Sequence, residues 1–244
     1  VLLMLGSGAC AWRCWYTAGT EIERMDPHSN PIAPEPDRSV RVLSYALVHG
    51  VYWKLLVWPA FLCYDYSFDA IPLVRTIMDL RLQLPLLAYL SLAMLICVSM
   101  DALRPPRGVS LSKTAAATVR RARQGPIVGL AVLALSFLPM SNIFFPVGTM
   151  VGERLLYIPS AGFLLTLVSL GRLWQVSTKG FARLVPVGLL LACGALAVWL
   201  CALRVPDWSS PEAITVADGL KQTRSTRVQF NYANVHLAAK RYDE

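Results

Sequence analysis

Charged residues are scarce in this chain, and their scarcity indicates the class of protein. Only 16% of the 244 residues are charged, whereas 55% are hydrophobic. A soluble domain usually carries about 25% charged residues. The apolar residues also form long blocks, which indicates membrane-spanning helices rather than one globular core. We therefore predict an all-α, polytopic, membrane-embedded protein.

The sequence also lacks the usual patterns of metal, redox and nucleic-acid sites. Its six cysteines form no Cys-x-x-Cys pair, and its three histidines show no metal-ligand spacing, so we predict no metal site formed by these side chains. The net charge of +8 does not indicate nucleic-acid binding, because the basic residues lie in short loops between apolar blocks. Val1–Tyr16 has no charged leader, and the chain stops at Glu244 without a helix-ending signal. We interpret it as a fragment cut at both ends.

Residues 1–204 are predicted to be the transmembrane region. One crossing needs roughly 20 apolar residues. The run from Gln124 to Gly152 carries no charge over 29 positions, so part of it must lie outside the hydrocarbon. The predicted spans are about 1–16, 82–100, 127–146, 155–171 and 184–203.

Loop charges predict the sidedness of these spans. Asp101–Arg123 carries six basic residues and one acidic residue, and the loop around Lys179 is also basic. Both loops should be cytosolic by the positive-inside rule. Thr17–Arg81, with six basic and eight acidic residues, then lies on the opposite side, together with Glu153-Arg154 and everything after Arg204.

Two further segments have a different character. Residues 43–64 are apolar and rich in Tyr and Trp, but are interrupted by His49, Lys54 and Pro59. This composition suits a helix on the far membrane surface, broken at Pro59, with a sixth span as the alternative. Residues 205–225 are predicted to be a linker, and apolar residues at helical spacing predict a soluble amphipathic helix within 226–244.

Residues 139–160 contain the strongest candidate site. Prolines at 139, 146 and 159 interrupt a continuous helix, and irregular backbone at membrane depth must be covered by protein or line a water-filled cavity. Glu153 and Arg154 are the only charges between Arg123 and Arg172. Such a pair is a functional candidate, and a guanidinium matches a phosphate. The alternative is that Arg154 extends to lipid headgroups while Glu153 neutralises it.

The same stretch resembles a known family. Ser-Asn-Ile-Phe-Phe-Pro-Val-Gly at 141–148 and Glu-Arg-Leu-Leu-Tyr-Ile-Pro-Ser-Ala-Gly at 153–162 resemble the signature of the transmembrane and tetratricopeptide-repeat-containing family. The resemblance covers about 30–244, including Asn-Pro-Ile-Ala at 30–33, segments within 58–73, the element around Trp208, and a partial tetratricopeptide repeat from 230. Ser29 stands where family members often have an acidic residue.

The resemblance implies a function. These proteins are endoplasmic-reticulum protein O-mannosyltransferases of the GT-C superfamily, so it implies the C-terminal part of a GT-C-like transmembrane domain followed by the start of a luminal α-solenoid. The donor would be dolichyl phosphate mannose, the acceptors Ser and Thr hydroxyls of cadherin-type proteins, and a divalent metal is possible. The catalytic base would lie upstream of Val1. Arg154 would bind the donor phosphate, and Glu153 would orient Arg154. Tyr157 and Asn142 would line the opening of the same donor site.

Two other functions stay open at this point. Broken spans with a charged pair also suit a transporter, but the apolar blocks have charge-free centres and no internal repeat. A non-catalytic protein whose spans anchor a luminal repeat domain is the other alternative. A paired-acid motif upstream of Val1 would favour the enzyme over the anchor.

Overall fold

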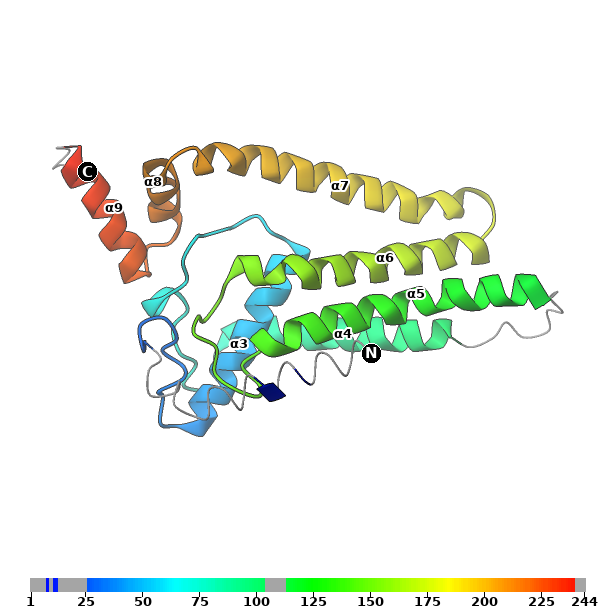
Figure 1. Ribbon diagram of the computed structural model, residues 1–244, viewed down its shortest axis with the longest axis horizontal. Coiled ribbons are helices and arrows are strands. Elements are labelled where there is room, and N and C mark those ends of the chain that lie inside the picture. The colour runs from blue at the N-terminus through cyan, green and yellow to red at the C-terminus, as the bar shows by residue number, and fades with distance from the viewer. Residues whose placement is uncertain (1–7, 9–10, 13–25, 104–112, 240–244) are drawn as a thin grey trace. The chain divides into compact units, whose positions relative to one another are not determined.

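The computed structural model describes residues 8, 11–12, 26–103 and 113–239, and no strand occurs among them (Figure 1). The helices are α3 Arg38–Val57, α4 Gln83–Ala102, α5 Lys113–Phe137, α6 Tyr157–Ser177, α7 Val185–Arg204, α8 Pro211–Lys221 and α9 Thr226–Ala238. Short 3-10 turns lie at Phe68–Ala70, Leu80–Leu82, Leu138–Met140, Glu153–Leu156, Gly180–Leu184 and Val205–Trp208. The all-α prediction is confirmed.

Five of the described helical segments are long and apolar enough to cross a membrane. They are Arg38–Val57, Leu80–Ala102, Arg123–Met140, Glu153–Ser177 and Gly180–Trp208. Three of them contain the predicted spans 82–100, 155–171 and 184–203. The predicted span 1–16 lies outside the described residues, apart from positions 8, 11 and 12. The polytopic membrane class is therefore confirmed.

The end of one predicted span needs correction. The span proposed at 127–146 is helical only as far as Met140, and residues 141–152 form an irregular loop. Pro139 lies in the closing 3-10 turn, and Asn142 has a φ of +58°, a left-handed conformation that cannot continue a right-handed helix. The charge-free run therefore combines a helix with a loop.

The described chain divides into two compact units. The first contains the chain up to Ala88, Phe137–Leu156 and everything from Arg204, and the second contains Tyr89–Ser136 and Tyr157–Leu203. The core of the first unit joins α3 to the loop before α6. Val48, Tyr52 and Leu55 lie on one helical face and pack with Met150 and Val151.

Helix α3 begins and ends with clear local signals. The Asp37 carboxylate caps its first turn by accepting a hydrogen bond from the Ser39 amide at 2.7 Å, and the helix ends at Val57, before Trp58-Pro59. The segments that flank α3 meet: the Phe68 amide donates to the His28 carbonyl at 2.6 Å, and the two rings stack. The chain after α3 thus returns to the segment that precedes α3.

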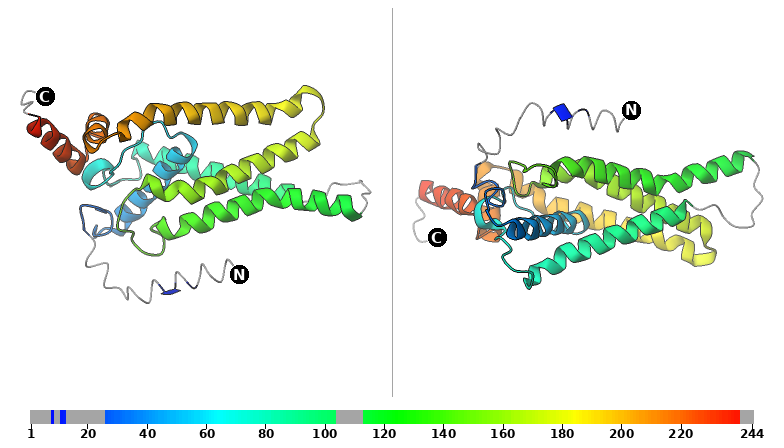
Figure 2. Two further views of the ribbon diagram at one scale, coloured as in Figure 1. Left: turned by 45° about the horizontal axis from the view of Figure 1, so that its top comes forward. Right: turned by 90° about the horizontal axis from the view of Figure 1, so that it is seen from below.

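In the second unit, helices α5 and α6 approach closely (Figure 2). A Cβ atom added to Gly162 would lie 2.8 Å from the Gly129 carbonyl oxygen and 2.9 Å from the Leu133 Cα. Small residues at such spacing let two membrane helices bring their backbones together. By contrast, no residue of α7 is buried, as expected for a span that contacts lipid.

The region after Arg204 contains a helix that the predicted linker 205–225 missed. Helix α8 starts with Ser210 as N-cap, whose hydroxyl accepts from the Ala213 amide at 3.1 Å, and with Pro211 at its first position. It pairs with α9, where Gln229 donates to the Gly219 carbonyl at 2.8 Å. The predicted amphipathic helix is α9, and the two helices form a hairpin.

Candidate active site

The loop before α6 is shaped by two asparagines. The Asn142 side-chain oxygen accepts a hydrogen bond from the Val147 amide at 2.8 Å. Asn30, which is fully buried, donates to the Val147 carbonyl at 2.7 Å and to the Asn142 side chain at 3.3 Å. Asparagine tolerates the left-handed φ that position 142 requires. Asn142 therefore supports the loop from within.

The far end of this loop is fixed to α3. The Gly152 amide donates to the Tyr52 hydroxyl at 3.0 Å, and the Met150 amide donates to the Ser29 carbonyl at 3.0 Å. The His49 ring donates to the Ser141 carbonyl at 2.6 Å. These contacts place Glu153 and Arg154 just before the first residue of α6.

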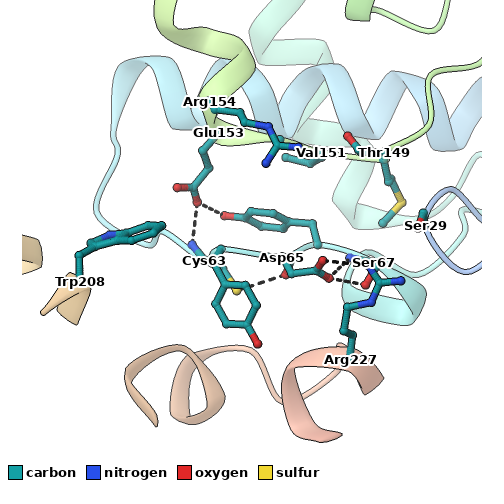
Figure 3. Close-up of a pocket in the computed structure, with 14 residues that line it drawn as sticks. Ser29, Cys63, Asp65, Ser67, Thr149, Val151, Glu153, Arg154, Trp208 and Arg227 are labelled. Carbon is teal, nitrogen blue, oxygen red and sulfur yellow. Dashed lines mark hydrogen bonds and ion pairs between the residues drawn. The ribbon is translucent and has the colours of Figure 1, made fainter. Parts of the chain in front are cut away.

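A pocket of about 220 Å³ lies beside this loop (Figure 3). Three segments supply most of its wall: residues 149–154, residues 63–67 and the region after Arg204. Its charged lining residues are Glu153, Arg154, Asp65 and Arg227. Of the four residues predicted for the donor phosphate, Glu153 and Arg154 line this pocket, whereas Asn142 and Tyr157 are not among its lining residues.

Glu153 binds a different partner from the predicted one. Its Oε1 accepts hydrogen bonds from the Cys63 amide and from the Tyr66 hydroxyl, both at 2.6 Å. Figure 3 shows this carboxylate and the Arg154 guanidinium leaving the loop in different directions. The expectation that Glu153 orients Arg154 is thus corrected. Glu153 instead anchors the segment 63–66, because the Cys63 amide and the Tyr66 phenol donate to its carboxylate.

Arg154 is an exposed cation of the pocket. Among the described residues, no hydrogen bond or ion pair of its guanidinium is found. Tyr157, the first residue of α6, is 84% exposed. A cation that is not neutralised by a carboxylate is available for an anionic ligand, and a guanidinium can give a phosphate two parallel hydrogen bonds.

The segment 63–67 has its own internal hydrogen bonds. The Asp65 Oδ1 accepts from the Ser67 amide at 2.8 Å and from the Ser67 hydroxyl. The Cys63 thiol is buried and donates to the Asp65 carbonyl at 3.2 Å. Burial raises the pKa of the Cys63 thiol to about 12, and burial together with the Glu153 carboxylate raises the pKa of the Tyr66 phenol.

The region after Arg204 holds this segment from another side. Asp218 of α8 accepts from the Tyr64 amide at 2.8 Å, and Asn231 of α9 donates to the Tyr64 hydroxyl at 3.1 Å. Arg227 of α9 pairs with Asp65 at 3.4 Å and with Asp26 at 3.6 Å. Asp65, Trp208 and Arg227 were not predicted as site residues. They are brought together only by the fold, since 162 positions separate Asp65 from Arg227.

Within the described ranges, no group of three or more His, Cys, Asp or Glu side chains is placed to hold an ion. The cysteines 63, 97, 193 and 201 are free thiols. The pocket itself is lined by arginines, carboxylates and one tryptophan.

Together, the fold and the pocket define a polytopic helical membrane protein with a polar, arginine-bearing site just before a span. Residues 20–93 match the family model described as Protein O-mannosyl-transferase TMTC, DUF1736. The chain belongs to the TMTC family.

Curated relatives extend the likeness over most of the chain. It is 31% identical to Protein O-mannosyl-transferase TMTC1 of Mus musculus over 91% of this chain and 22% of that protein. It is 30% identical to TMTC4 of Homo sapiens over 87% of this chain and 26% of that protein, and 36% identical to human TMTC3 over 62% of this chain and 14% of that protein. The chain thus spans about a quarter or less of these relatives. No solved structure matches it.

Proposed function

We propose that the protein containing this chain transfers mannose from dolichyl phosphate mannose to Ser and Thr hydroxyls of secretory proteins, with cadherin-type domains as acceptors. The observation that carries the proposal is Arg154, an exposed arginine that lines a pocket and lies three positions before the first residue of the apolar helix α6. A lipid-linked donor needs such a site, because its phosphate lies where its apolar tail enters the membrane. The names of the relatives support mannosyl transfer to protein.

In the proposed reaction, Arg154 stabilises the leaving phosphate. The acceptor oxygen forms a bond to the anomeric carbon of mannose, while the bond from that carbon to the phosphate oxygen breaks. The hydroxyl proton passes to a carboxylate base, which we expect upstream of Val1. Dolichyl phosphate leaves with one more negative charge on the phosphate oxygen. A fixed guanidinium stabilises this developing charge, and one such donor is worth about 10²–10³-fold in kcat.

The sidedness of the chain follows from the same proposal. The pocket contains residues 63–67, 149–154, Trp208 and Arg227. All of these belong to the side opposite the arginine-rich segment 104–123 by the charge rule. We place this side in the lumen of the endoplasmic reticulum, with the C-terminal end of the chain luminal.

Mannosyl transfer by Arg154→Ala in the full-length protein tests the proposal. We expect kcat for transfer of labelled mannose to a cadherin-type domain to fall about 100-fold or more. Arg154→Lys should restore only part of it, because a lysine lacks the bidentate fork. Arg75→Ala is the matched control, since Arg75 is also an exposed arginine of the first unit but does not line the pocket.

Two outcomes would contradict the proposal. Unchanged transfer by Arg154→Ala would remove Arg154 from the donor site. Absence of transfer by the wild-type protein, with acceptor binding retained, would favour the non-catalytic membrane anchor.

A further inference from the structure

Part of the lining of the pocket that holds Arg154 comes from the region after α7. Trp208 follows α7, and Arg227 lies in the first turn of α9. Figure 3 shows Arg227 reaching from α9 towards Asp65 and Ser67, whereas Arg154 comes from the loop before α6. The α8–α9 hairpin therefore supplies part of the site rather than merely following it.

Arg227 holds Asp65 at the pocket wall. Its Nη1 lies 3.4 Å from the Asp65 Oδ2, and its guanidinium carbon lies 5.7 Å from the centre of the Phe68 ring. The Asp65 side chain remains 20% exposed. A carboxylate offers about four acceptor positions, and the Ser67 amide, the Ser67 hydroxyl and Arg227 occupy three of them. One position is left for a ligand in the pocket.

The chemistry of that remaining position is specific. An ionised carboxylate only accepts hydrogen bonds, so it selects a donor such as a hydroxyl. Both substrates of the proposed transfer carry hydroxyls: the mannosyl group of the donor and the Ser or Thr side chain of the acceptor. The exposed Trp208 ring adds an apolar surface to the same pocket.

We infer that Asp65 binds a substrate hydroxyl and that Arg227, on α9, is the positioning residue that holds Asp65 in place for it. This inference rests on the proposed mannosyl transfer and adds a second function to the same pocket. Arg154 acts on the leaving phosphate and sets kcat. Asp65, held by Arg227, acts on binding and sets KM. The α8–α9 hairpin is thus required for substrate binding at this site.

The test uses Arg227→Gln, Arg227→Lys and Asp65→Asn in the full-length protein. The Arg227–Asp65 pair is partly exposed, and exposed pairs contribute little to stability, so all three variants should fold. We expect Arg227→Gln to raise KM about tenfold for one substrate, with kcat within about twofold of wild type, because a displaced Asp65 weakens binding. Arg227→Lys, which keeps the charge, should restore most of the affinity.

The two KM values identify the hydroxyl. A rise for dolichyl phosphate mannose assigns it to the mannosyl group, and a rise for the cadherin-type domain assigns it to the acceptor side chain. Asp65→Asn should raise the same KM, and the double variant should be no worse than either single variant if the pair acts as a unit. Arg224→Gln is the matched control, an exposed arginine three positions from Arg227 that does not line this pocket.

A measurement without catalysis separates this inference from the proposed function. Cys63 is buried and donates to the Asp65 carbonyl, so its thiol reports on the segment 63–67. Its maleimide labelling should be slow in wild type and several-fold faster in Arg227→Gln, and unchanged in Arg224→Gln. Wild-type protein that transfers no mannose overturns the proposed function. Unchanged KM values and unchanged Cys63 labelling in Arg227→Gln overturn this inference.

Discussion

Asp218 receives two hydrogen bonds from the guanidinium of Arg204, from Nη1 at 2.6 Å and from Nη2 at 2.8 Å. The Asp218 side chain is fully buried, and it also accepts from the Tyr64 amide at 2.8 Å. Arg204 is the last residue of α7, and Asp218 belongs to α8. One carboxylate therefore fixes the end of a span, the helical hairpin and the pocket segment to one another.

Replacing Asp218 with Ala should destabilise this junction strongly. The change removes the bidentate partner of Arg204, whose side chain is only 12% exposed and keeps only its ion pair with Asp207 at 2.7 Å, and it also removes the acceptor of the Tyr64 amide. Breaking a buried pair in this way costs about 3 kcal/mol or more. Thermal unfolding of the detergent-solubilised protein should show a clearly lower midpoint. Glu212→Gln, an exposed change on the same helix, is the control, and equal midpoints for both variants would contradict this role of Asp218.

The contact between α5 and α6 gives a second stability prediction. Because a Cβ at Gly162 would meet backbone atoms of Gly129 and Leu133 below 3.0 Å, Gly162→Ala must push the helices apart. Overpacking of this kind costs about 1–3 kcal/mol. The matched control is Gly194→Ala on α7, where a Cβ meets nothing within 4 Å and a small gain from the better helix former is expected.

Thermal unfolding in lipid nanodiscs compares the two alanine variants directly. Gly162→Ala should unfold at a lower temperature than wild type, and Gly194→Ala at the same or a higher temperature. If Gly162→Ala matches Gly194→Ala, the helices do not depend on this close approach.

Local sequence patterns predicted the parts of the fold that local forces determine. Charge-free runs of membrane length predicted the helices that became α4, α6 and α7, because lipid selects on length and polarity alone. Helix α8 was missed although its signal is present: Ser210-Pro211-Glu212 is an N-cap, a favourable first residue and an acidic first turn. The small residues Gly129 and Gly162 likewise carried a readable packing signal.

The site was predictable only in part. The isolated charges Glu153 and Arg154 marked it, since charges are rare in such a chain. The partners of Glu153 could not be predicted, because Cys63 and Tyr66 lie about 90 positions earlier and contribute ordinary donors. Asn142 was predicted to line the donor site, whereas its side chain supports the loop backbone. A single sequence does not encode such long-range pairings in any local pattern.

Sidedness gives the last prediction, and it also tests the path of α3. His28 lies before α3 and Phe68 after it, and the two are in contact, so both flanks of this helix should face the same compartment. We expect Arg38→Cys and Thr76→Cys to react with an impermeant maleimide only after the endoplasmic-reticulum membrane is opened. Ser177→Cys, at the last residue of α6, should react once the plasma membrane alone is permeabilised. Opposite results for Arg38→Cys and Thr76→Cys would mean that α3 is a span. If Ser177→Cys is protected from the maleimide under these conditions, the predicted orientation is wrong. The end of α6 would then lie on the luminal side, although the charge rule places the neighbouring basic residues in the cytosol.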